Sequence, residues 1–306
     1  MYHYIRDSSA VMPLAHKITL AEFSKHIQLV NPLDSNSINE CLIYLEEALI
    51  NKKRKCIDLK KEESVFTFDD GIRDHFTAAQ VLEAEGSSGI FFIASKPYIE
   101  GKFLDVHLIH HLVYQENIEL VHSSFKKLVY SNLNIASIYE NYLKASEGEY
   151  NFYGDDAQRN EIKVFMNRFF PENYKTTFLE ELLNEINVRP NVNDFYLSRN
   201  QLTEMKRMGM IIGGHTHSHR VLSQLTEDEQ FDELLCCYKF ISDCIGDEPK
   251  VFSYPFGRKS SYNLNTLRLL EKSNFKYAFT VDENDLEKSD SIYELSRYDC
   301  NVLNLD

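Results

Sequence analysis

Residues 65–94 read VFTFDDGIRDHFTAAQVLEAEGSSGIFFIA, and this stretch decides the class of fold. Its first part, 65–69, is a short apolar run that is typical of a buried strand, and Gly71 interrupts it. Over 74–85 the apolar residues recur at helical spacing, and a glycine directly after them is suited to end a helix. Residues 89–94 are again short and apolar. The stretch therefore predicts a β-α-β unit.

The same alternation returns near residue 198. We expect helices at 198–208, 226–245 and 263–273, and strands at 210–214, 251–254 and 276–281. Ser198 and Thr226 are suited to cap the first two of these helices, and Glu229 completes a capping box with Thr226. Short strands that alternate with helices predict an α/β protein, with a parallel sheet or barrel and the helices outside it.

Residues 96–197 follow a different pattern. Apolar residues recur there at helical spacing over 106–114, 123–128 and 160–186, so we expect a largely helical insertion. The insertion contains a cluster of ionisable side chains, Asp105, His107, His110 and His111. On a helix, the first two histidines would be three residues apart on one face. A structural or solvated role is the favoured interpretation, and a place beside a binding cleft or a second metal site are the alternatives.

Composition excludes some classes of partner. The chain has 306 residues, with 33 Lys plus Arg against 47 Asp plus Glu, for a formal charge of −14. Such an acidic surface repels phosphate backbones, so we expect no nucleic acid partner. No run reaches the roughly 18 apolar residues that span a bilayer, so no transmembrane segment is expected. The first residues also lack the pattern of a signal peptide, which favours a cytoplasmic location.

Three stretches combine a predicted strand end with reactive or turn-forming residues. They are Thr67-Phe68-Asp69-Asp70-Gly71, Gly214-His215-Thr216-His217-Ser218-His219 and Ser253-Tyr254-Pro255-Phe256-Gly257. In α/β folds reactive groups gather at the carboxyl ends of strands. His215 and His219 are four residues apart, which on a helical turn would align their rings. Two imidazoles with a carboxylate suit Zn²⁺ and leave a position open for water.

In this order the three stretches resemble the motifs of the NodB-type polysaccharide deacetylases, a family of metal-dependent carbohydrate de-N-acetylases. The resemblance covers about residues 1–100 and 198–302 of the chain. It implies a distorted (β/α) barrel, a single catalytic domain over 1–306 with the helical insertion, and an N-acetylated sugar or glycan precursor as substrate. It also implies a divalent metal, with zinc as the first expectation.

The resemblance also implies roles for individual residues. Asp70, His215 and His219 correspond to the metal ligands, and Asp69 to the catalytic base. The backbone N–H of Phe256 would stabilise the oxyanion. Three further residues are expected to border the substrate or support the loop, namely Thr216, Tyr254 and Pro255.

Two departures from the family pattern concern the partners of the base. Ser253 stands where the third motif often has an arginine that orients the base, and three arginines are candidate substitutes: Arg73, Arg258 and Arg297. The C-terminal motif with a general-acid histidine is also missing. The poly-N-acetylglucosamine deacetylase branch, which this chain resembles most, places that histidine in an N-terminal Tyr-His segment. Tyr2-His3-Tyr4 fits this pattern, so His3 is the candidate general acid.

Two alternatives to a sugar deacetylase remain open at this point. One is a catalytically silent carbohydrate-binding protein on the same fold, which Ser253 and the missing C-terminal histidine favour. The other is a hydrolase of a non-sugar amide, because one fold supports several chemistries. The sequence does not identify the sugar, its linkage or the oligomeric state.

Overall fold

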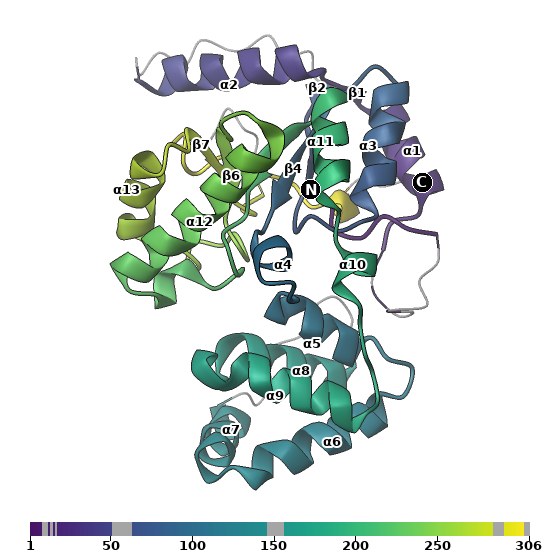
Figure 1. Cartoon of the computed structure of the whole chain (residues 1–306), viewed down its shortest axis with the longest axis vertical. Helices are drawn as coiled ribbons and strands as arrows, with labels where there is room; N and C mark the ends of the chain where they lie inside the picture. Colours follow the sequence, from purple (N-terminus) through teal and green to yellow (C-terminus); the bar gives the residue numbers. More distant parts are fainter. Residues whose placement is uncertain are drawn as a thin grey trace. The chain divides into compact units, whose positions relative to one another are not determined.

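The computed structural model describes residues 1–7, 12, 15, 17–50, 63–145, 156–283 and 291–302 (Figure 1). The chain divides into two compact units. The first combines Met1–Asp7, Lys17–Lys102 and Asn193–Asp306, and the second consists mainly of Phe103–Val192. The second unit thus comes from the segment in which the sequence predicts a helical insertion. The assignment of 1–306 to a single catalytic domain stays a prediction.

A parallel sheet forms the centre of the first unit. Its five strands follow one another in chain order and form a curled half-barrel: β3 (Phe66–Phe68), β4 (Gly89–Ile93), β5 (Ile211–Gly214), β6 (Val251–Ser253) and β7 (Tyr277–Phe279). All five lie within the ranges that the sequence predicts. The predicted α/β fold class with a parallel sheet is therefore confirmed.

Helices cover the sheet of this unit. They are α1 (Leu20–Leu29), α2 (Ser35–Ile50), α3 (His75–Ala84), α4 (Lys96–Ile99), α11 (Arg199–Arg207), α12 (Glu227–Ile245) and α13 (Leu264–Lys272), with a short strand pair, β1 (Asn31–Pro32) and β2 (Glu63–Ser64). Thr226 and Glu229 form the predicted capping box of α12, and Ser198 caps α11 through Gln201. Gly246 ends α12 in the left-handed conformation, which glycine adopts without steric cost.

The two faces of the sheet are both apolar, as expected for parallel strands that are covered on each side. In β4, Phe91 and Ile93 pack in a cluster with α1, α3, α11 and α12. Ile90 and Phe92 point to the opposite face and pack with residues of α2, β6 and β7. The residue before β4 forms a backbone hydrogen bond with Leu33, which comes just before α2. Helix α2 therefore covers the amino ends of the strands (Figure 1). The carboxyl ends are left for the site.

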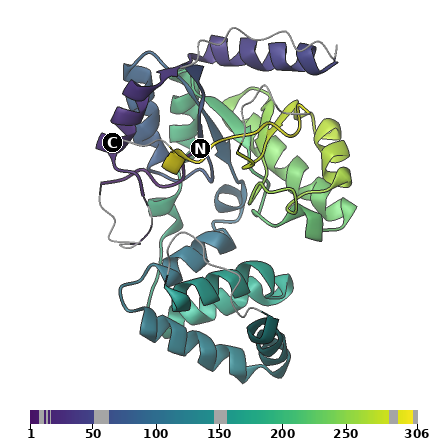
Figure 2. The same ribbon diagram turned by 180° about the vertical axis from the view of Figure 1, so that it is seen from behind.

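Segments from both ends of the chain lie beside the outer strands. Tyr2 forms a bridge with Phe68 in β3, and Leu295 forms one with Phe279 in β7. The two segments meet where the N–H of Cys300 donates to the carbonyl oxygen of Met1. Figure 2 shows the yellow C-terminal segment running to the N-terminus. Outer strands carry unpaired backbone groups, and these segments satisfy part of them.

The second unit is helical, as predicted. Its helices are α5 (Asp105–Val113), α6 (Ile118–Ser131), α7 (Leu133–Ala145), α8 (Ala157–Arg168) and α9 (Glu172–Glu185), followed by α10 (Val192–Phe195) at its boundary. The helical spacing over 160–186 spans two helices, because Pro171 separates α8 from α9. Proline has no N–H to donate and disfavours a helical conformation in the residue before it. In the described part of the chain, no helix is long and apolar enough to cross a membrane.

Candidate metal centre

Two adjacent carboxylates follow β3 at its carboxyl end. Asp69 and Asp70 are both buried, with 3% and 4% of their surface exposed. Neighbouring side chains on a strand point to opposite faces, but Asp70 has already left the strand conformation, with a φ of 81°. Gly71 follows with a φ of 68°, where an added Cβ would lie 3.1 Å from Ile93. This tight turn allows both carboxylates to serve one site.

The two ligand histidines follow β5 in a compact loop. Thr216 and His219 both have left-handed φ angles, 63° and 62°, and the hydroxyl of Thr216 accepts a hydrogen bond from the N–H of His219 at 2.9 Å. The expectation that His215 and His219 align on a helical turn is therefore wrong in its reason. A turn with two left-handed residues, and not a helix, brings their rings to a centroid distance of 4.8 Å.

Asp70, His215 and His219 converge from the carboxyl ends of β3 and β5, the two strands that flank β4. Oδ1 of Asp70 lies 3.3 Å from Nε2 of His215 and 3.3 Å from Nε2 of His219. This spacing is long for a charge-assisted hydrogen bond, which is about 2.7–2.9 Å. Ligands about 2.0–2.1 Å from a tetrahedral ion lie about 3.4 Å apart. Among the described residues, this is the one group of three or more His, Cys, Asp and Glu residues that could hold a metal ion.

The environment of His215 fits a metal ligand. Its Nδ1 lies 2.7 Å from the carbonyl oxygen of Ser253, so Nδ1 carries a proton and donates it. In the neutral ring Nε2 is then free of a proton and can bind a metal. Burial opposes protonation, but the carboxylates of Asp70 and Asp69 raise the pKa of His215 above its ordinary value. The same negative charge favours a cation between the three side chains.

The candidate base is held by an arginine from the C-terminal segment. Arg297 donates to both carboxylate oxygens of Asp69, at 2.8 and 2.9 Å, and also to the hydroxyl of Ser253 at 2.8 Å. Burial opposes ionisation of Asp69, but the charges of Arg297 and His215 outweigh it and hold the pKa of Asp69 well below its usual range. Of the three arginines that the sequence offers, Arg297 is therefore the one that pairs with the base. Arg73 instead donates to the carbonyl oxygen of Asn193.

The third motif divides between the core and the surface. Tyr254 is buried, stacks on Tyr262 at 4.1 Å and donates its hydroxyl to the carbonyl oxygen of Tyr293. Pro255 is also buried, so substrate contacts from Tyr254 and Pro255 stay predictions. Phe256 is 38% exposed, has a φ of 61°, and its ring lies 5.1 Å from that of His219. Its backbone N–H therefore belongs to a turn that contacts the metal-binding group.

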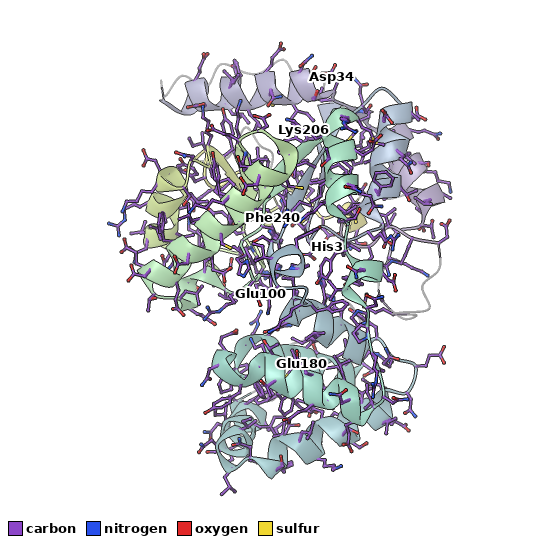
Figure 3. The ribbon with its side chains drawn as sticks, in the orientation of Figure 1. His3, Asp34, Glu100, Glu180, Lys206 and Phe240 are labelled. Carbon is purple, nitrogen blue, oxygen red and sulfur yellow. The ribbon has the colours of Figure 1, made fainter. Side chains whose placement is uncertain are left out.

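His3 lies in the N-terminal segment beside β3. The backbone of Tyr2 brackets the strand end: its N–H donates to Thr67 and its carbonyl accepts from the N–H of Asp69. The side chain of His3, labelled in Figure 3, is exposed. Its charge contributes to the lowered pKa of Asp69, so it lies within electrostatic range of the base. This position is compatible with the predicted role as general acid, which stays a prediction.

Unfavourable backbone conformations are concentrated here. Six non-glycine residues among the described ones have a positive φ, and four of them belong to the three motifs: Asp70, Thr216, His219 and Phe256. Non-glycine residues in this region cost free energy and persist where the surroundings demand them. Their concentration at three strand ends independently marks this edge of the sheet as functional.

The second histidine cluster lies on α5, in the second unit. His107 and His111 are buried, the ring centroids of His107 and His110 are 6.1 Å apart, and Asp105 accepts a hydrogen bond from Thr176 at 3.0 Å. No metal-binding group of three forms there among the described residues. The alternative of a second metal site on α5 thus has no support in the structure.

Comparison with known proteins relates part of the chain to one family. Residues 169–278, which include the second and third motifs, match the family model for Polysaccharide deacetylase. Over these residues the chain is similar to the polysaccharide deacetylase family. A putative polysaccharide deacetylase of Bacillus subtilis (strain 168), YxkH, is 29% identical over 102 residues, which are 33% of this chain and 36% of that protein. The match thus spans about a third of the length of this relative.

Two solved structures share the fold of this chain. The deacetylase PplD of Streptococcus pyogenes has a TM-score of 0.56 at 16% identity, over 97% of this chain and 88% of that one. The deacetylase domain of BpsB from Bordetella bronchiseptica has a TM-score of 0.51 at 12% identity, over 97% and 94%. At these identities the likeness shows the fold alone, so it is the residues of the site that must carry the function.

Proposed function

We propose that this protein is a metal-dependent hydrolase that removes the acetyl group from an N-acetylated sugar and releases acetate. The observation that carries the proposal is the set of Asp70, His215 and His219 with an ionised, buried Asp69 directly beside it in the chain. A protein that only binds carbohydrate needs no such base next to a metal site. A divalent metal, with zinc as the first candidate, would supply a Lewis acid that polarises the acetamide carbonyl and makes water more acidic.

The base acts through a fixed carboxylate. Arg297 holds Asp69 in one orientation by two parallel hydrogen bonds, a geometry that arginine provides and lysine does not. Because its pKa is low, Asp69 is ionised throughout the physiological pH range and is ready to accept a proton from the attacking water. Oδ2 of Asp69 also accepts from the hydroxyl of Ser253 at 3.3 Å, so the second lone pair of Oδ1 is the better placed to accept this proton.

Two further groups would complete the reaction. The backbone N–H of Phe256 would donate to the developing oxyanion, and one such donor contributes about 3–4 kcal/mol in well-studied hydrolases. The imidazolium of His3 would donate a proton to the nitrogen of the leaving amine. The substrate is proposed from the family and from the neutral acetamide that such a site would accept.

An acetate-release assay tests the proposal. Purified protein is stripped with a chelator, reloaded with Zn²⁺, Co²⁺ or Ni²⁺, and incubated with oligomers of N-acetylglucosamine and with nucleotide- and lipid-linked N-acetylated sugars. We expect acetate from at least one substrate, and a fall of about 10²–10⁴-fold in kcat for Asp69→Asn, because the base is lost while the metal ligands remain.

The metal content separates the outcomes of this assay. If Asp69→Asn has wild-type metal content and no activity, the role of Asp69 as the base is supported. Arg297→Lys should lose less activity, because the positive charge remains while the two parallel hydrogen bonds do not. A wild-type protein that binds metal yet releases no acetate from any of these sugars would refute the proposed function. It would favour the carbohydrate-binding alternative.

A further inference from the structure

The residues between the two ligand histidines are each anchored, although none of them is a ligand. Thr216 caps the N–H of His219, His217 points toward the segment after β4, and Ser218 points toward α12. A loop with left-handed residues at both Thr216 and His219 is unfavourable by itself. Something outside the loop must therefore hold it in the conformation that brings His215 and His219 together.

The segment that follows β4 holds the loop on one side. Nδ1 of His217 lies 2.9 Å from the hydroxyl of Ser95, and Nε2 lies 2.8 Å from Oε1 of Glu100. A carboxylate accepts, so Nε2 donates to Glu100 and Nδ1 accepts from Ser95. A backbone hydrogen bond joins the same two segments, since the N–H of Lys96 donates to the carbonyl oxygen of His217 at 2.8 Å. Glu100 directly follows α4 (Figure 3).

A buried carboxylate on α12 holds the loop on the other side. Glu233 is only 7% exposed, and it accepts hydrogen bonds from the backbone N–H of Ser218 at 2.7 Å and from the hydroxyl of Ser218. A buried carboxylate is costly unless donors surround it, so this pairing fixes Ser218 against α12. The segment after β4 and helix α12 therefore contact two adjacent residues of the loop, His217 and Ser218.

We propose that Glu100, acting through His217, and Glu233, acting through Ser218, are positioning residues for the metal site. Neither contacts the ligand atoms, but together they fix the loop so that His215 and His219 reach Asp70 before a metal arrives. A loop without this support would have to be ordered by the metal itself, which lowers affinity. The proposal rests on the proposed function only in taking a divalent metal as the group bound.

Metal affinity is the measurement that tests this proposal. The dissociation constant for Zn²⁺ is measured on metal-free protein by competition with a chromogenic chelator, and the absorption spectrum of the Co²⁺ form reports ligand geometry. We expect His217→Leu and Glu233→Gln each to weaken binding by about 10-fold, as for other residues that orient ligands. Asp232→Asn, a matched control at an exposed acidic residue beside Glu233, should bind as the wild type does.

Other measurements separate positioning from general stability. Thermal unfolding of each metal-free variant shows whether it folds. Glu100→Ala serves as a milder variant because the side chain of Glu100 is partly exposed. At saturating metal, kcat should recover toward the wild-type value. Zinc affinity within twofold of wild type in folded His217→Leu, Glu233→Gln and Glu100→Ala would overturn the proposal. These titrations need no substrate, so a protein without deacetylase activity would refute the proposed function and leave this test intact.

Discussion

Two regions of this protein are rich in histidine, and among the described residues only one of them contributes to a group that could hold a metal ion. The loop at 215–219 and helix α5 each hold three histidines within five residues, and α5 also has an acidic residue, Asp105. In the loop, two left-handed residues turn His215 and His219 toward Asp70, which follows β3 on the other side of β4 in the sheet. On α5 the side chains project around a helix, and two of the three histidines are buried in its packing. The carboxyl ends of parallel strands bring side chains together from distant parts of the chain, whereas one helix cannot.

The largest effect is expected from removing the carboxylate of Asp70, toward which His215 and His219 turn. Asp70→Asn keeps the shape of the side chain but removes the negative charge that both imidazoles share. We expect zinc affinity to fall by more than about 100-fold, because the loss of a ligand exceeds the 10–100-fold that changes behind the ligands cost. Acetate release at limiting metal should be lost as well. Elemental analysis and chelator competition measure both the stoichiometry and the affinity.

Asp105→Asn is the matched control on α5. Asp105 accepts a hydrogen bond from Thr176, and the amide oxygen of asparagine can accept the same bond. Metal content and affinity should equal those of the wild type. If both variants lost metal equally, the distinction between the two regions would be wrong.

The sequence predicts the fold well where local signals suffice. Short apolar runs and caps place β3 to β7, α11 and α12 within a few residues of their observed bounds. Helical spacing alone does not divide 160–186, where Pro171 separates two helices. For the site, adjacency along the chain reveals Asp69, Asp70 and the two histidines. The pairing of Asp69 with Arg297 joins residues 228 positions apart, so spacing alone leaves three arginines as candidates.

The conformation of the loop is the part that sequence reasoning could not supply. A spacing of four residues suggests a helical turn, yet Thr216 and His219 are left-handed. The two residues between them contact Ser95, Glu100 and Glu233, which lie in other elements. Glu233 carries one local signal, since it is an acidic residue on the buried face of an otherwise amphipathic helix. A buried acid without a local partner is a candidate for a role in a site.

An intermediate effect is expected from His75, a buried histidine at the start of α3. Its Nε2 lies 2.6 Å from the carbonyl oxygen of His3, and burial lowers its pKa to about 4 from an ordinary 6.5. As the pH falls below 6.5, His75 binds a proton in the unfolded chain. In the folded chain, His75 stays neutral until about pH 4. The free energy of unfolding of the metal-free protein should therefore fall by roughly 3 kcal/mol from this group between pH 7 and 4.

Urea unfolding at a series of pH values measures this contribution. His75→Gln keeps an N–H donor for the carbonyl of His3 but does not titrate, so its unfolding free energy should depend less on pH by that amount. An unchanged pH dependence in the variant would show that other groups, and not His75, cause the acid sensitivity.

The smallest effect on metal binding is expected on α5, where His107 is fully buried. His107→Gln removes an aromatic ring from a packed helix, so we expect the unfolding free energy to fall by about 1–2 kcal/mol. Zinc stoichiometry and affinity should stay within twofold of wild type, because among the described residues no three metal-binding side chains converge on α5. Loss of a bound metal equivalent in this variant, with the site at Asp70 intact, would mean that helical histidines do hold an ion. The carboxyl ends of the strands would then no longer be what separates the two regions.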